Sequence, residues 1–309
     1  MGFFTNNNVI NITIGGNVQY VNNDFSNMFY NCYNFNSPVN IPNSIVNMRN
    51  SFAGCNNFNQ PVVIPNNVTS LVNTFAGCRN FNQPISISDS VTNMQYTFAG
   101  CLNFNQPVSI PNGVTGLGLF GTFNYCINFN QPIEIPNGVT SLYGTFSRCN
   151  SFNQSLVIPD GVTSMHTTFN MCANLNSPII IPNSVNNMAE TFYYCNNFNQ
   201  PINIPVNVNK LHNTFGYCRN MASNIYIYST IVNNAKSMLH ARYSNGSCKR
   251  LNIFVPVGST TNTTIANTNA SYSVVNKTIS WTKDTANNCY YNTAYNVYVY
   301  YKNVDEYYT

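Results

Sequence analysis

The first residues that could do chemistry are the cysteines, because thiols bind metals, form disulfides and act as nucleophiles. The chain has 11 cysteines among 309 residues. Nine of them recur every 23 residues, with one interval of 25: Cys32, Cys55, Cys78, Cys101, Cys126, Cys149, Cys172, Cys195 and Cys218. A period this regular indicates a repeated structural unit, because solenoid proteins repeat at such spacings.

If each repeat forms one coil of a solenoid, the cysteines stack in a single column and do not converge on a tetrahedral metal site. We therefore expect them to fill the interior as small apolar side chains. The predicted core includes Cys55, Cys78, Cys101, Cys126, Cys149, Cys172, Cys195, Phe75 and Phe98. Neighbouring coils are close enough for disulfides, but an odd column of nine thiols cannot pair fully. We expect mostly free thiols.

The other candidate catalytic groups are few and scattered. His166 and His212 are 46 residues apart, which is two repeats, or about 10 Å in a solenoid. Glu134 and Glu190 fall on different faces of the coil, so no carboxylate pair has the spacing of a glycosidase. Hydrolase, zinc-protease, phosphate-loop and dinucleotide motifs are absent from the sequence. We predict no enzyme, cofactor or metal; a carbohydrate-active enzyme on a solenoid is the weakest alternative.

Each repeat carries the same apolar positions, which predict its local structure. Phe stands three residues before each Cys and usually three after it. A short alternating run such as residues 62–64, between Pro61 and Pro65, predicts a strand with two side chains inward and one outward. Leu71, Phe75 and Cys78 follow helical spacing and predict a short helix or helical turn. One repeat cannot bury its apolar face alone, whereas stacked repeats can.

Asparagine also recurs in phase with the cysteines. It stands four residues after the Cys from Asn36 through Asn199. We expect these side chains to form a column parallel to the thiols, with each amide bonded to turn backbone or to the next Asn.

The chain divides into three predicted regions. Residues 1–25 lack the repeat and, with Gly15 and Gly16 as a hairpin signal, predict an N-terminal β cap. Residues 26–257 predict a solenoid of about nine to ten repeats. Residues 258–309 predict a Tyr-rich β segment with a strand near residues 297–300. The predicted fold class is an α/β repeat solenoid with short parallel strands, short helical segments and a β-rich C-terminal cap.

Composition excludes several kinds of partner. Charged residues make up 6% of the chain, against about 25% in typical soluble proteins. The net charge of +4 comes from scattered residues without a basic stripe, so we expect no nucleic-acid binding. No apolar run has the length of a membrane span. The first residues do not read as a secretory signal, so we expect either a removed leader or a protein never exported by one.

The repeat resembles a known family. The segments "VTNMQYTFAGCLNFNQPVSI" (residues 91–110) and "NNMAETFYYCNNFNQPINI" (residues 186–204) resemble the BspA-like leucine-rich repeats, in the variant found in mycoplasma lipoproteins and bacterial surface proteins. The resemblance covers about residues 26–227. It implies a leucine-rich-repeat solenoid used on surfaces for adhesion and protein binding, without catalysis. The secretion signal and anchor that are usual in the family are not visible in this sequence.

Two functions follow from the resemblance. Such repeats also occur in tailed-phage genomes, and a virion protein needs no leader, so our first prediction is a virion component that decorates a head or tail and attaches to the host. The alternative is a secreted cell-surface adhesin of the BspA type. In either case we expect a host protein, a host surface glycan or neighbouring virion proteins as partners, within a homo-oligomer or larger assembly.

Binding is expected on the side chains that point outward from the strands. Along the repeats these are Asn40, Val63, Ser86, Ser109, Glu134, Val157, Ile180, Asn203 and Tyr226. We select Glu134, Val157, Ile180, Asn203 and Tyr226 as binding residues, together with Trp281, the single tryptophan. The run from Val157 to Ile180 is a mild apolar patch that a partner could cover, and ordinary exposed aliphatic residues would explain it equally well. The C-terminal tyrosines could serve either as a β cap or as a docking surface.

Overall fold

The structure, a computed structural model, describes residues 21–228, 238, 251–256, 282–284, 289–292 and 297–302. The chain divides into two compact units, Met1–Gln154 and Ser155–Thr309. The predicted hairpin at Gly15 and Gly16, Trp281 and most of the predicted C-terminal segment lie outside the described residues. Among the residues that are described, no helix is long and apolar enough to cross a membrane.

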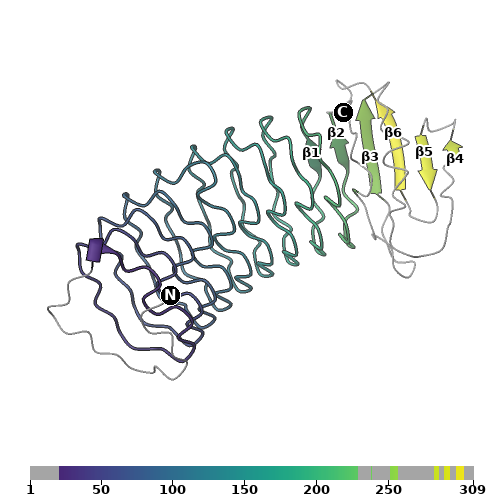
Figure 1. Cartoon of the computed structure of the whole chain (residues 1–309). Coiled ribbons are helices and arrows are strands. Elements are labelled where there is room, and N and C mark those ends of the chain that lie inside the picture. Colours follow the sequence, from purple (N-terminus) through teal and green to yellow (C-terminus); the bar gives the residue numbers. More distant parts are fainter. Residues whose placement is uncertain are drawn as a thin grey trace. The chain divides into compact units, whose positions relative to one another are not determined.

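The described part of the first unit begins with a short 3-10 helix, η1 (Val21–Asn23), and then winds into stacked coils, one for each repeat (Figure 1). Parallel bridges connect the same position of successive coils, as in Asp24 with Asn47 and Asn47 with Ser70. The second unit shows the same arrangement, with a bridge between Ser164 and Asn187. The repeated sequence therefore forms stacked coils, as its period predicts.

The segment between the Leu/Met and Cys positions, which we call the turn side of a coil, differs from the prediction. In residues 71–78 the expected helical segment is a run of consecutive turns. The N–H groups of Thr74 and Cys78 donate to carbonyl oxygens three residues earlier, at 3.0 and 2.9 Å. Alternate N–H groups cross to the next coil: Phe75 donates to Thr97 at 2.9 Å and Gly77 donates to Ala99 at 2.6 Å. Because the two patterns alternate, the backbone N–H groups of this segment find hydrogen-bond acceptors without forming a helix.

Left-handed residues cause this alternation. Asn73 has φ of 55° and Gly77 has φ of 75°, and the same two positions are left-handed in every coil from Asn27 to Tyr217. A left-handed residue interrupts the i to i−4 bonds of an α-helix. Leu71, Phe75 and Cys78 are therefore the buried side of a run of turns and not of a helix. The turns bring inward the same three positions that a helix would.

The alternating run between the prolines, which we call the strand side, follows the prediction in part. Val62 and Ile64 are buried and Val63 is exposed, as the alternation requires. Within the described part of the chain, however, residues 62–64 make no backbone hydrogen bond to another coil. The same run meets the criteria of a strand at β1 (Ile202–Ile204) and β2 (Ile225–Ile227), which pair in parallel. The proline before the run has no N–H to donate, which weakens any ladder there.

The core includes two columns of phenylalanine. In the first unit, the column three residues before Cys has ring centroids 5.4 to 5.8 Å apart from coil to coil. The column three residues after Cys has centroids 5.7 to 6.3 Å apart. The wider spacing in the second column fits the absence of ladder bonds at residues 62–64. Each stacked pair adds roughly 0.5–1.5 kcal/mol beyond the burial of its area.

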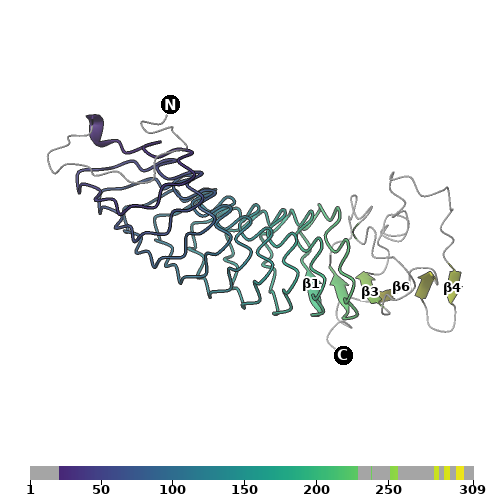
Figure 2. The same cartoon turned by 90° about the horizontal axis from the view of Figure 1, so that it is seen from below.

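The second unit ends in a six-stranded sheet of order β1-β2-β3-β6-β5-β4. It contains β3 (Leu251–Pro256), β4 (Thr282–Asp284), β5 (Cys289–Asn292) and β6 (Val297–Lys302). The sheet is parallel from β1 through β6 and antiparallel from β6 to β4. Figure 2 shows β1, β3, β6 and β4 in one row along the unit. The strand predicted near residues 297–300 is confirmed as β6.

Candidate functional site

The cysteines lie in the interior. All nine in the column are free and fully buried. Within each unit the thiol donates a hydrogen bond to a Phe carbonyl oxygen of the preceding coil: Cys78 Sγ lies 3.0 Å from the oxygen of Phe52, and Cys101 Sγ lies 3.1 Å from that of Phe75. The thiol therefore fills space and also ties one coil to the next.

Burial keeps these thiols protonated. It raises the pKa of Cys78 and of Cys101 well above the ordinary value of 9.0, and the neighbouring thiols raise it further. A thiolate is the form that attacks electrophiles and binds metals. In the part of the chain that the structure describes, no group of three or more His, Cys, Asp or Glu side chains is arranged to hold a metal ion. The column thus offers structure rather than reactivity.

A column of buried threonines was not singled out from the sequence. Thr97 is fully buried, and its Oγ1 lies 2.9 Å from the Leu71 carbonyl oxygen and 2.8 Å from that of Met94. The signal was present as a Thr directly before Phe: Thr74, Thr97, Thr122, Thr145, Thr168, Thr191 and Thr214. The sequence alone does not show that this Thr is buried, because a Thr before a turn is commonly exposed. Its burial follows from the geometry of the turns.

The asparagine ladder is confirmed. The Oδ1 of Asn36 accepts hydrogen bonds from the N–H of Asn59 at 2.8 Å and from Nε2 of Gln60 at 3.2 Å. A second, exposed ladder lies two residues after the Cys, where Asn57 Nδ2 donates to Asn34 Oδ1 at 3.4 Å. The amides of both ladders are engaged between coils and stabilise the stack.

The outward strand positions lie where the alternation predicts. In the first unit, Glu134 is exposed, as is Val63. In the second unit, Val157 is 85% exposed and Ile180 is 81% exposed. Such exposure is high for large aliphatic side chains, and it adds nothing to the stability of the folded state. Glu134 belongs to the first unit, whereas Val157 and Ile180 belong to the second.

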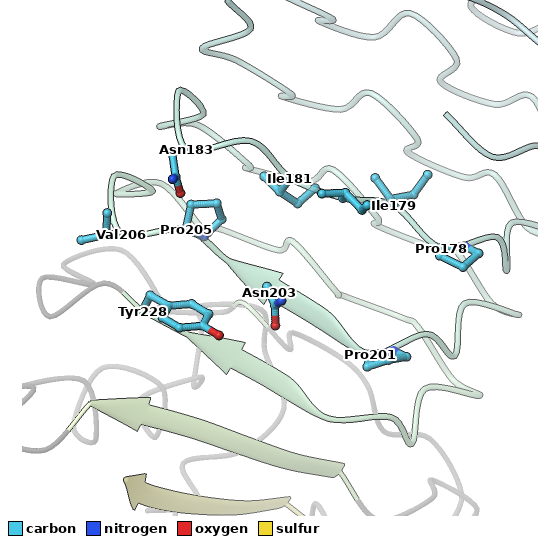
Figure 3. Close-up of a pocket in the computed structure, with 10 residues that line it drawn as sticks. Pro178, Ile179, Ile181, Asn183, Pro201, Asn203, Pro205, Val206 and Tyr228 are labelled. Atoms are coloured by element: carbon cyan, nitrogen blue, oxygen red, sulfur yellow. The ribbon is translucent and has the colours of Figure 1, made fainter. Parts of the chain in front are cut away.

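A groove on the strand side of the second unit brings two of the predicted residues together. It has a volume of about 420 Å³ and lies between the run 178–181 and β1 (Figure 3). Ile180 and Asn203 line it, with Pro178, Pro201 and Val206 adding apolar surface. Val157 and Tyr226 do not line the groove, and Trp281 lies outside the described residues.

The polar groups of the groove are neutral. Asn183, Asn203 and Tyr228 line it alongside the apolar side chains (Figure 3). Neither the Asn183 nor the Asn203 side chain makes a hydrogen bond within the described part of the protein, in contrast to the ladder amides. Asn183 and Tyr228 were not predicted, because the sequence alone does not show that side chains of these different coils line the same groove.

An aromatic row continues from the groove along the sheet. Asn203 on β1 is in register with Tyr226 on β2, Tyr226 with Phe254 on β3, and Phe254 with Tyr300 on β6. The Tyr226 and Phe254 rings stack with centroids 4.9 Å apart. Asn224 Nδ2 donates to the Tyr226 hydroxyl oxygen at 2.9 Å. Tyr226, predicted as a binding residue, therefore belongs to a row next to the groove.

The coils described above match a known family. The family described as "Mycoplasma protein of unknown function, DUF285" matches residues 2–89, 64–158, 88–180 and 140–250. The chain belongs to this family. The overlapping DUF285 matches reflect the repeats and cover most of the chain. They confirm the predicted resemblance to BspA-like leucine-rich repeats of the mycoplasma type.

One solved structure shows the same fold. A leucine-rich repeat protein from Bacteroides ovatus ATCC 8483 is similar with a TM-score of 0.54 and 19% identity, over 74% of this chain and 58% of that one. A leucine rich cell surface protein from Faecalibacterium prausnitzii A2-165 gives a TM-score of 0.41 and 20% identity, over 78% of each chain. This DUF285 chain thus spans 58% of the Bacteroides protein's length. None of the curated proteins matches it. The Bacteroides likeness confirms the predicted leucine-rich-repeat solenoid.

Proposed function

We propose that this protein is a non-enzymatic binding protein of a cell surface, and that it holds its partner on the strand side of its second unit. One observation carries the proposal: Val157 and Ile180 are more than four-fifths exposed, and Ile180 borders a groove of about 420 Å³. Exposed aliphatic side chains beside a concavity are typical of contact sites.

The chemistry of the coils supports binding over catalysis. The thiols that could act as nucleophiles are buried and hold their protons, as at Cys78 and Cys101. His166 is half-buried, and burial lowers its pKa, with Glu190 opposing that shift. A reaction would require groups that converge near a substrate. The groove instead offers amides, a phenol and apolar side chains, which bind without reacting.

The adhesin alternative is favoured over the virion component. The chain belongs to the family that the BspA-type resemblance named, and that resemblance implies a role on cell surfaces. None of the contacts described above favours the virion role, which stays a prediction.

The binding proposal can be tested on cells with the purified full chain. Labelled protein is added to a panel of animal and bacterial cells, and bound protein is measured by flow cytometry. Ile180→Asp places a charge at the groove, and Val63→Asp is the matched control, since Val63 takes the same strand position and is 80% exposed. We expect Ile180→Asp to weaken binding about 30-fold, as for a contact worth about 2 kcal/mol, with Val63→Asp unchanged.

The location is tested separately. Brief protease treatment of intact producing cells is expected to remove the protein, and immunogold labelling is expected to decorate their surface. Recovery of the protein in purified phage particles, with none on the cells, would support the virion role instead.

In the binding experiment, equal binding by both Asp variants, each folded like the wild type, would contradict the use of the strand side.

A further inference from the structure

We propose that the groove between the run 178–181 and β1 binds a neutral glycan, that is, an uncharged oligosaccharide. This inference rests on the proposed binding function and names the class of its partner. Three features of the groove carry it: two uncommitted amides, an apolar lining with one phenol, and the lack of charge.

The amides are the first feature. Asn183 and Asn203 line the groove, and neither side chain has a partner within the described residues. Each amide offers two N–H donors and one acceptor oxygen. A sugar hydroxyl also donates and accepts, so adjacent hydroxyls can bond both ways to one amide. Most other asparagines near this site are already engaged, as Asn199 is with Ala222 and Ser223. The two free amides are therefore the ones left for a ligand.

The apolar lining is the second feature. Pro178, Pro201 and Ile180 are exposed at the groove, and Tyr228 also lines it. Figure 3 shows Pro178, Pro201 and Tyr228. A pyranose ring has one face made of C–H groups, which packs on aliphatic and aromatic side chains. Ligand sites combine such apolar walls with a few fixed polar groups. The volume of about 420 Å³ is within the range of roughly 300–1,000 Å³ of such sites, so a short segment of an oligosaccharide fits.

The lack of charge is the third feature. The residues that line the groove include no Asp, Glu, Lys or Arg. Anionic sugars and phosphates are bound through Arg or Lys, which pair with their oxygens. A peptide added as a strand needs an open sheet edge. Here β1 pairs with β2, and the run 178–181 lies along its other side (Figure 3). The groove therefore suits an uncharged sugar better than an acidic glycan or an added strand.

The experiment uses the full chain on an array of immobilised neutral, sialylated and sulfated oligosaccharides. Neutral probes are expected to bind. With the best probe, titration calorimetry should show about a tenfold weaker Kd for Asn203→Ala, since a hydrogen bond of this kind is worth about 1.4 kcal/mol. Asn40→Ala is the matched control, because Asn40 holds the same outward position in the first unit and is exposed. Binding to acidic probes alone, to no probe, or equally by both variants would overturn the inference.

A second measurement separates this inference from the binding function. Cells are treated with periodate, which cleaves the vicinal diols of their surface glycans, before the full chain is added. Loss of binding is the expected result. Binding that survives periodate and still falls with Ile180→Asp would leave the binding function in place and remove the glycan. Binding that does not respond to Ile180→Asp would remove the binding function itself.

Discussion

On the turn side of a coil, as in residues 71–78, alternate N–H groups cross to the next coil, with Phe75 donating to Thr97 at 2.9 Å. On the strand side of the same coil, residues 62–64 form no such bonds with the residues that the structure describes. The turn side also holds the thiol and hydroxyl bonds of Cys78 and Thr97. In this coil the backbone hydrogen bonds to the next coil therefore lie on the turn side rather than at residues 62–64.

The two sides also differ in how freely their residues vary. Phe, Thr and Cys recur at the turn-side positions, because each must fit a buried column. The outward strand position is Val63 in one coil, Ser86 in the next and Glu134 later in the same unit. An outward side chain contacts solvent and is free to change. The comparison teaches that the turn side specifies the fold, whereas the strand side can hold a binding site at little cost to stability.

The largest expected effect is the loss of stability at high pH. Burial raises the pKa of buried thiols such as Cys78 well above 9.0, the value expected when the chain unfolds. The folded state therefore keeps a proton that the unfolded state loses, and stability falls as the pH rises above about 9. Each thiol contributes about 1.4 kcal/mol per pH unit in that range. Urea unfolding at pH 7 to 10 measures the slope.

Cys78→Ala serves as the control for the pH effect. Removal of one thiol should make the slope shallower by about 1.4 kcal/mol per pH unit. Native protein should also resist thiol-specific reagents at neutral pH. A slope unchanged by the substitution, or rapid labelling of the folded protein, would contradict the buried column.

The second largest effect is expected from truncation of a core ring, which should cost more stability on the turn side than truncation of a side chain on the strand side. Phe75→Ala removes a ring that stacks on Phe52 at 5.6 Å and on Phe98 at 5.8 Å. We expect a loss of about 3–5 kcal/mol in the free energy of unfolding, because a cavity replaces the ring. Val63→Ala, on the exposed strand side, should cost less than about 0.5 kcal/mol. Urea denaturation of both variants checks the difference, and similar losses would refute the contrast.

A smaller effect is expected where the backbone is left-handed. Gly77 has φ of 75°, and a Cβ there would meet only Gly54 atoms at 3.6 Å. Gly77→Ala should therefore lose about 1–2 kcal/mol from backbone conformation alone.

At the equivalent position in a later coil, Tyr125 has φ of 62° and its ring lies under Arg148, with 5.4 Å from the guanidinium carbon to the ring centroid. Tyr125→Gly should change stability little, because relief of strain offsets a lost cation–π contact of about 0.5–1 kcal/mol.

The smallest effect concerns the buried hydroxyls. Thr97→Val removes a hydrogen bond to the Leu71 or Met94 carbonyl oxygen but keeps the shape of the side chain. Both oxygens keep a backbone donor, from Thr74 and Thr97 respectively, so we expect a loss of only about 1 kcal/mol. The exposed Thr92 is the control, and Thr92→Val should leave the thermal midpoint unchanged. A larger loss at Thr92 than at Thr97 would contradict the buried column.

Part of the binding site could be predicted and part could not. Ile180 and Asn203 follow from the alternation of buried and exposed residues, which needs only the side-chain polarity along one strand. Asn183 and Tyr228 come from other positions of their repeats, and only the stacking of coils brings them to the same groove. Tyr226 and Phe254 stack across β2 and β3 because the sheet continues past the last regular repeat.

The sequence by itself determined the period, the buried columns and the side of each coil that faces solvent, because these depend on the polarity of side chains at constant spacing. The tertiary structure decided that the segment 71–78 forms turns, since with its left-handed residues alternate N–H groups donate to carbonyl oxygens of another coil. It also decided where a groove opens, because that depends on how neighbouring coils meet. A helix and a turn run can share one apolar pattern, and only the partners of the backbone distinguish them.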